Sequence, residues 1–119
     1  MYSEQLMNLF HDASHAGTLP GETHRGVGGT PGGGPFIVLA FRVAEEVVRE
    51  ARFQTYGCPA AIACAEMVCR VSEGRQLSLL QALTAAEITL LVGGVPEGKE
   101  HCPALAAQAL ARLAPLAAA

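Results

Sequence analysis

The sequence lacks the features of membrane, secreted and nucleic-acid-binding proteins. Half of its residues are apolar, yet charged side chains interrupt the apolar stretches, so none reaches the roughly 20 residues that a membrane helix needs. Residues 1–5 have neither the basic start nor the apolar core of a secretory signal. The net charge is −3 and the basic residues are scattered singly, which excludes the basic surface that binds nucleic acid. We therefore expect a cytoplasmic protein without membrane or nucleic-acid partners.

Two common motifs are missing as well. There is no C-x-x-C pair, which excludes the usual zinc-finger pattern. The glycine-rich stretch over 17–35 follows no predicted strand and does not end in Gly-Lys-Ser/Thr, which excludes a phosphate-binding loop. Four cysteines can form two disulfides, but the N-terminus gives no support for an oxidising compartment. We expect reduced thiols.

The length of 119 residues fits one domain, 1–119. Hydrophobic periodicity and turn signals predict an α+β fold, with a small antiparallel sheet of about three strands and helices packed on one face. The expected elements are a helix from Ser3 ending before Gly17, a loop over 17–35, strands over 36–43 and 47–56, a helix from Pro59 that Gly74 ends, and helices over 75–83, after Thr84 and over 103–113.

Two cysteines directly precede prolines that open apolar helices, namely Cys58 before Pro59 and Cys102 before Pro103. Proline suits the first helical position, so both thiols are predicted at helix N-caps, near unpaired N–H groups and the positive end of the helix dipole. That environment favours the thiolate, which binds metal or accepts sulfur. His101 adjoins Cys102, and imidazole with thiolate suits zinc or iron.

A structural role is the alternative for every cysteine, because free cysteine is often buried as a small apolar side chain. For Cys64 and Cys69, inside the predicted helix, we expect core packing. The remaining histidines lie in the first helix or the polar loop, where solvated side chains are expected: His11, His15 and His24. Cys58 and His101 could also form the catalytic dyad of a cysteine hydrolase. The sequence identifies no carboxylate that would orient the histidine, so this function is disfavoured.

Three segments together resemble the IscU/NifU iron–sulfur scaffold family: Arg52-Phe53-Gln54-Thr55-Tyr56-Gly57-Cys58, Gly93-Gly94-Val95-Pro96 and His101-Cys102-Pro103-Ala104-Leu105-Ala106. The start, Met1-Tyr2-Ser3-Glu4, is similar too. The resemblance runs in order over nearly the whole chain. It implies a SufE/NifU-like fold and a scaffold rather than an enzyme.

The resemblance also implies a ligand set and partners. The family assembles a [2Fe–2S] cluster on three cysteines with a nearby Asp and His, and Cys58, Cys102 and His101 match the second and third cysteines and the histidine. The implied cargo is iron or a [2Fe–2S] cluster, with zinc as a further candidate metal. The implied partners are a cysteine desulfurase and apo iron–sulfur proteins. An incomplete ligand set would also leave a position for water, a small thiol or a second copy in a homodimer.

The first family motif, Gly-x-Pro-x-Cys-Gly-Asp, does not match. It corresponds to 29–35, which puts Gly33 where the first cysteine is expected and Pro35 where the Asp is expected. Neither side chain offers a metal ligand. The family's chaperone-docking segment also differs over 95–99.

Two alternatives follow from that loss. One is a SufE-like sulfur acceptor that carries persulfide on Cys58 without iron. The other is a relative that does not assemble clusters but binds zinc and regulates the desulfurase.

Overall fold

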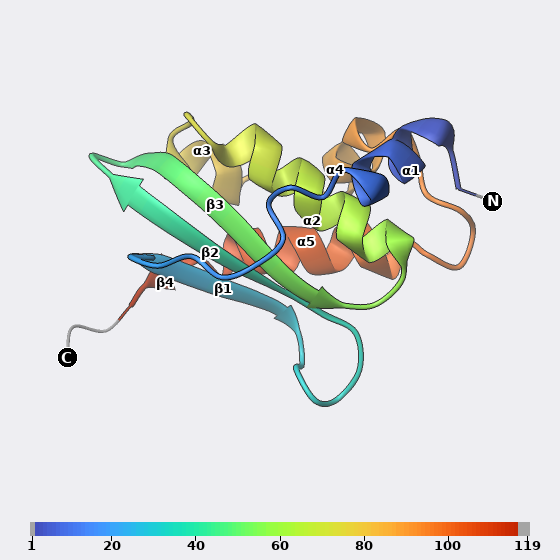
Figure 1. Cartoon of the computed structure of the whole chain (residues 1–119), viewed down its shortest axis with the longest axis horizontal. Helices are drawn as coiled ribbons and strands as arrows, with labels where there is room; N and C mark the ends of the chain where they lie inside the picture. The colour runs from blue at the N-terminus through green and yellow to red at the C-terminus, as the bar shows by residue number, and fades with distance from the viewer. Residues whose placement is uncertain (1, 117–119) are drawn as a thin grey trace.

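The computed structural model describes residues 2–116, which form a sheet with helices packed against one face (Figure 1). Its elements, in chain order, are α1 (Glu4–His11), β1 (His24–Gly29), β2 (Phe36–Ala44), β3 (Val47–Tyr56), α2 (Pro59–Ser72), α3 (Leu77–Gln81), α4 (Ala85–Leu91), α5 (His101–Ala111) and β4 (Ala114–Pro115). The α+β prediction is confirmed. Among these residues, no helix combines the length and apolar character needed to cross a membrane.

The sheet has four strands in the order β3-β2-β1-β4, one more than expected, and its neighbours are antiparallel. The additional long strand, β1, lies within the stretch predicted to be a loop, so that prediction is wrong there. The glycines that suggested a loop serve packing instead. A Cβ at Gly26 would lie 2.1 Å from the Ala109 carbonyl oxygen, and one at Gly28 would lie 2.0 Å from that of Leu105. Only glycine lets β1 and α5 approach this closely.

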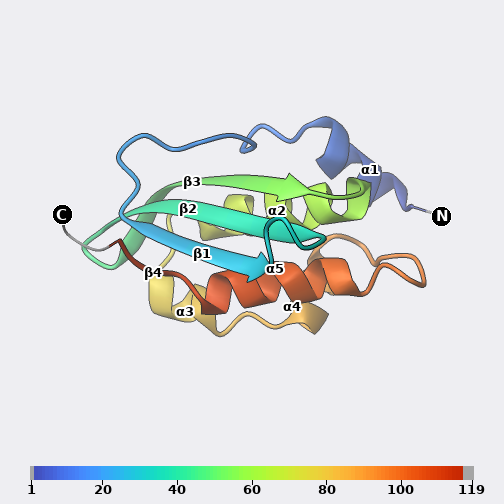
Figure 2. The same cartoon turned by 90° about the horizontal axis from the view of Figure 1, so that it is seen from below.

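Helices α2 and α5 run along the sheet on the same side, and both views show the strands on one side of them (Figures 1 and 2). Predicted helix signals are confirmed at two starts. The Ser3 side chain accepts a hydrogen bond from the Leu6 N–H, and Thr84 forms a capping box with Glu87. The last helix starts at His101, two residues earlier than expected.

The core lies between the sheet and these helices. Cys64 and Cys69 are fully buried in it, as predicted. Burial raises the pKa of Cys64 to about 12 and that of Cys69 well above its ordinary value, so both are inert thiols. The other fully inaccessible large side chains are Leu6, Ile37, Leu39, Phe41, Val48, Glu66, Val68, Ile88, Val92 and Leu110.

The segment after α1 covers the edge of β3. The Phe53 N–H donates to the His15 carbonyl and the Gly17 N–H donates to the Phe53 carbonyl, so the segment pairs with β3 as a short parallel bridge at Ala16. The prediction of a solvated His15 is wrong, because its ring is only 16% exposed and lies between two carboxylates. Its partners, Glu66 and Glu73, are too distant in sequence for a local pattern to reveal. His11 is exposed and His24 is half-buried.

Candidate functional site

The predicted ligands meet at one end of the sheet. Gly29, Phe36 and Tyr56 lie abreast in the strand register, so the β1–β2 loop and the chain leading to Cys58 leave the sheet at the same end. Helix α5 also begins at this end (Figures 1 and 2). The Cys58 Sγ lies 3.7 Å from the Cys102 Sγ, and the Cys102 Sγ lies 3.6 Å from the His101 Nε2. We call these three residues the thiol cluster.

Cys58 occupies the predicted N-cap of α2, with extended backbone and Pro59 opening the helix. Its side chain is partly exposed. Burial raises the pKa of the thiol, but the N–H of Ala61, the Cys102 thiol and the N–H of Ala60 together outweigh burial, so the pKa of Cys58 is below its ordinary value. Cys58 is therefore the accessible thiol of the cluster and the one that is more readily deprotonated.

Cys102 differs from the prediction. The N-cap of α5 is Glu100, so Cys102 lies inside the first turn and is completely buried, with Pro103 after it. Proline is still tolerated there because first-turn N–H groups need no helical partner. Burial and then the adjacent Cys58 raise the pKa of the Cys102 thiol to about 12. The pKa is therefore lowered at Cys58 and raised at Cys102, so the expectation of a favoured thiolate at Cys102 is wrong.

Two further side chains influence the cluster and were missed. Tyr2 lies against Cys58, and burial followed by Cys58 raises the pKa of its hydroxyl. The positive charge of Lys99 acts in the opposite direction on Cys102 and Tyr2. Lys99 stands three residues before Cys102 and could have been found as a nearby cation. Nothing in the sequence links residue 2 to residue 58.

The two measured separations fit one tetrahedral metal. With bonds of about 2.3 Å to sulfur and about 2.0 Å to nitrogen, two sulfur ligands lie about 3.8 Å apart and a sulfur–nitrogen pair about 3.6 Å apart. The Cys58–Cys102 and Cys102–His101 pairs match these edges. Across residues 2–116, however, no three His, Cys, Asp or Glu side chains form a group arranged to hold a metal. Each pair is therefore spaced for a metal, whereas the three side chains together need adjustment to bind one.

The positions of the missing ligands lie in the loop between β1 and β2. Gly33 and Pro35 are both exposed there. The Gly33 N–H donates to the Thr30 carbonyl, and its neighbours Gly32 and Gly34 have φ of +84° and +135°. Gly33 itself has no positive φ, and the atoms nearest to a Cβ there would belong to Thr30, from 3.3 Å at its side chain to 3.6 Å at its carbonyl oxygen. The loop therefore contributes no ligand but has a backbone that accepts one.

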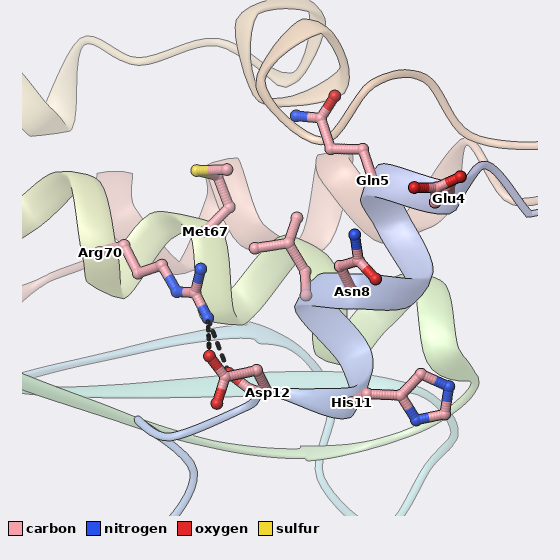
Figure 3. Close-up of a pocket in the computed structure, with 8 residues that line it drawn as sticks. Glu4, Gln5, Asn8, His11, Asp12, Met67 and Arg70 are labelled. Carbon is pink, nitrogen blue, oxygen red and sulfur yellow. Dashed lines mark hydrogen bonds and ion pairs between the residues drawn. The ribbon is translucent and has the colours of Figure 1, made fainter.

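A hollow of about 670 Å³ lies elsewhere, between α1 and α2, and Figure 3 shows its lining. Met67 and Arg70 line it from α2, and the Arg70 guanidinium is held by the Asp12 carbonyl and carboxylate. None of the cysteines lines this hollow. The chemistry is concentrated at the thiol cluster instead.

Residues 1–114 match the family described as the NifU-like N terminal domain. The chain belongs to this family. It is 30% identical over 112 residues to the iron–sulfur cluster assembly scaffold protein IscU 1 of Archaeoglobus fulgidus, covering 94% of this chain and 73% of that protein. It is also 30% identical over 113 residues to IscU of Escherichia coli K12, covering 92% and 88%. The predicted resemblance is confirmed.

Solved structures with low identity support the same fold. A protein proposed as an iron–sulfur cluster assembly scaffold of the SUF system, from Fervidobacterium islandicum, superposes with a TM-score of 0.72 at 16% identity, covering 92% of this chain and 93% of that one. The N-terminal part of a NifU-like protein from Brucella abortus gives 0.61 at 15% identity, covering 91% and 76%. The fold is therefore NifU-like.

Proposed function

We propose that this protein is an iron–sulfur cluster assembly scaffold that binds iron, or a [2Fe–2S] cluster, through Cys58, Cys102 and His101. The observation that carries the proposal is that two pairs, Cys58–Cys102 and Cys102–His101, share Cys102 and each have a separation that suits ligands of a tetrahedral metal. Membership of the NifU-like family and the IscU relatives support it. The protein acts as a carrier of its cargo rather than as an enzyme.

Each ligand has a distinct part in this proposal. Cys58 makes the first bond to iron, because it is partly exposed and its lowered pKa makes it the more readily deprotonated thiol. Cys102 must lose a proton to bind, and the metal charge supplies the stabilisation that its buried position withholds. His101 is exposed and can turn toward the metal as the third ligand. The remaining position stays open, since Gly33 and Pro35 provide no side-chain ligand.

An open position suits a protein that passes its cargo on. A ligand from a cysteine desulfurase, from an apo iron–sulfur protein or from a second copy in a homodimer can complete the coordination. We propose these three as partners, the first two on the strength of the family and the third because the ligand set is incomplete. Zinc satisfies the same sulfur and nitrogen geometry, so a zinc-bound regulator of the desulfurase is the outcome to be distinguished.

The test is anaerobic reconstitution of the reduced protein with iron and sulfide, followed by desalting, iron and acid-labile sulfide analysis and a visible spectrum. We expect equal amounts of iron and sulfide to be retained, and Cys58→Ser or Cys102→Ser to lose at least nine-tenths of both. Cys69→Ala is the matched control, because it removes a buried thiol outside the cluster. Equal loading of all variants, or retention of zinc but not iron in a parallel reconstitution with zinc, would refute the proposal.

A second candidate function is supported by one observation. Cys58 is both the partly exposed thiol and the one with the lowered pKa, as a SufE-like sulfur acceptor needs. A desulfurase supplied with L-cysteine should then add 32 mass units to Cys58 in the absence of iron. If Cys58 gains no sulfur under these conditions, this function is eliminated.

A further inference from the structure

The thiols of the cluster differ in access. Cys58 is partly exposed at the start of α2, whereas Cys102 is completely buried behind it in the first turn of α5. Their sulfurs are in contact, at 3.7 Å. A sulfur atom delivered from solvent therefore reaches Cys58 and not Cys102. Cys58 can therefore receive sulfur from solvent, and the buried Cys102 thiol is in contact with it.

We propose that Cys102 is a resolving thiol, which releases sulfide from a persulfide on Cys58. This inference rests on the sulfur-handling role proposed above and adds a reaction to it. Cluster assembly consumes sulfide, whereas a persulfide carries sulfur that is two electrons more oxidised. The Cys58–Cys102 pair can supply those two electrons within one chain, because two thiols give up two electrons when they form a disulfide.

The step is a thiol–disulfide exchange. The Cys102 sulfur attacks the Cys58 Sγ, a Cys58–Cys102 bond forms, and the bond between the Cys58 Sγ and the outer sulfur breaks with its electron pair on hydrosulfide. The outer sulfur is reduced to sulfide and the cysteine pair is oxidised to a disulfide. The proton of Cys102 has an acceptor nearby, since the His101 Nε2 lies 3.6 Å from its sulfur. A thiol reductant then restores the pair for another cycle.

The geometry favours attack on the inner sulfur rather than transfer of the outer one. Exchange requires the attacking sulfur, the attacked sulfur and the leaving sulfur to lie nearly in line. Cys102 stands on the buried side of Cys58, so an outer sulfur on the solvent side lies opposite the attack. The Sγ–Sγ separation must shorten from 3.7 Å to about 2.05 Å, so the two side chains have to move toward each other.

Because the family's first cysteine is missing, Cys102 is the thiol that is available to react with a persulfide on Cys58. Gly33 places no thiol in the β1–β2 loop, and Cys64 and Cys69 are buried in the core. The one thiol in hydrogen-bonding contact with Cys58 is therefore Cys102 among the residues that the structure describes. A persulfide on Cys58 has a single intramolecular partner.

The experiment uses reduced, iron-free protein treated anaerobically with one equivalent of glutathione persulfide and desalted at once. Released sulfide is then measured as its bimane derivative, and the intact mass is recorded without any added thiol. We expect the wild type to release about one sulfide per chain and to end 2 mass units lighter, with a Cys58–Cys102 disulfide in the peptide map. Cys69→Ala is expected to behave in the same way.

The variants separate this step from the proposed function. Cys102→Ser and Cys102→Ala should keep 32 extra mass units on Cys58 and release at least tenfold less sulfide, with unchanged circular dichroism showing that they fold. A stable persulfide on the wild type, equal sulfide release by the Cys102 variants, or a disulfide to Cys64 would overturn the inference. Iron and sulfide loading is measured separately, so either proposal can fail alone.

Discussion

Helix α2 contributes to two clusters of polar and titratable side chains that differ in how completely their hydrogen bonds are satisfied. At its N-terminal end is the thiol cluster, in which each measured contact is 3.6–3.7 Å. Farther along is a second group, His15, Glu66, Arg70 and Glu73, which we call the carboxylate clamp. Its hydrogen bonds are 2.7–2.9 Å long where they involve the His15 side chain or the Glu66 carboxylate.

The carboxylates of the carboxylate clamp each have more than one hydrogen-bonding partner. Glu66 is fully buried and accepts from the His15 N–H, the His15 Nδ1 and the Arg70 Nε. The His15 Nε2 lies 2.9 Å from Glu73, whose other oxygen accepts from the Ala51 N–H. Both ring nitrogens of His15 thus lie within hydrogen-bond distance of a carboxylate. The comparison teaches that satisfied polar clusters fix structure, whereas clusters with open positions are available for chemistry.

The largest effect on stability is expected from Glu66→Ala. It removes the fully buried acceptor of three donors, but the Arg70 side chain is 37% exposed, so the expected cost is at the low end for a buried ion pair, about 3 kcal/mol of unfolding free energy. Urea unfolding followed by circular dichroism measures it, with the exposed Glu97→Ala as control. If the urea midpoint of Glu66→Ala equals that of the wild type, the carboxylate clamp does not stabilise the fold. The proposed difference between the two clusters would then be wrong.

Gly28→Ala is expected to have the second-largest effect on stability. It acts by displacing the helix that carries Cys102, not by removing a ligand. The added Cβ would lie 2.0 Å from the Leu105 carbonyl, so α5 must move, at about 1–3 kcal/mol. Because Cys102 is on the same helix, iron retention should fall as well. Gly33→Ala is the matched control, since the atoms nearest to its Cβ belong to Thr30, at 3.3 Å or more. Equal iron retention in both variants would show that α5 does not set the thiol spacing.

Glu73→Gln should have a smaller, pH-dependent effect. Partial burial raises the pKa of Glu73, but the His15 hydrogen bond, the Ala51 N–H and the charges of His15 and Arg52 outweigh it, so the pKa lies below 4.5. A lowered pKa stabilises the fold above the unfolded-state pKa, and this stabilisation is lost as pH falls through the folded-state value.

Because Glu73 is about a third exposed, with 32% of its side chain accessible, solvent screening limits the effect to about 0.5–1 kcal/mol at pH 7. Unfolding of wild type and Glu73→Gln from pH 7 to pH 3 measures it. The difference should be constant down to about pH 5 and shrink below it. A difference that grows toward acid pH would contradict the sign.

Gly33→Cys should change stability least, by less than about 0.5 kcal/mol, because the position is exposed and its backbone accepts a side chain. It sharpens the comparison by filling the open position of the thiol cluster. After reconstitution, iron loss to a chelator should slow at least fivefold relative to Gly33→Ser. Equal rates for the two variants would show that the loop does not reach the metal.

Local patterns in the sequence predicted much of this architecture. Alternating and β-branched residues located β2 and β3, Thr84 and Glu87 located a capping box, and the Cys-Pro pair located Cys58 at a helix start. Each of these depends on neighbours within a few residues. For that reason the sequence was sufficient to predict these local elements.

Features that depend on distant contacts escaped prediction. The glycines of β1 suggested a loop, because the close approach of α5 that requires them involves residues about 80 positions away. His15 was assigned to solvent because Glu66 and Glu73 are 51 and 58 positions away. The thiolate predicted at Cys102 was wrong because burial, a tertiary property, opposes charge more strongly than a helix start favours it.

The pairing of residues 15–17 with β3 also governs how another chain can attach. An uncovered edge strand offers its backbone to any extended segment. Here the β3 edge is occupied over Phe53, and the strand at the opposite edge, β4, has only two residues, of which Pro115 has no N–H to donate. A partner strand that adds to β3 would first have to break the hydrogen bonds between Phe53 and residues 15–17. It would also have to separate His15 from Glu66 and Glu73. A protein that approaches the sheet end, where Cys58 lies, meets no such barrier, so it can reach the thiol cluster without disrupting the strand pairing.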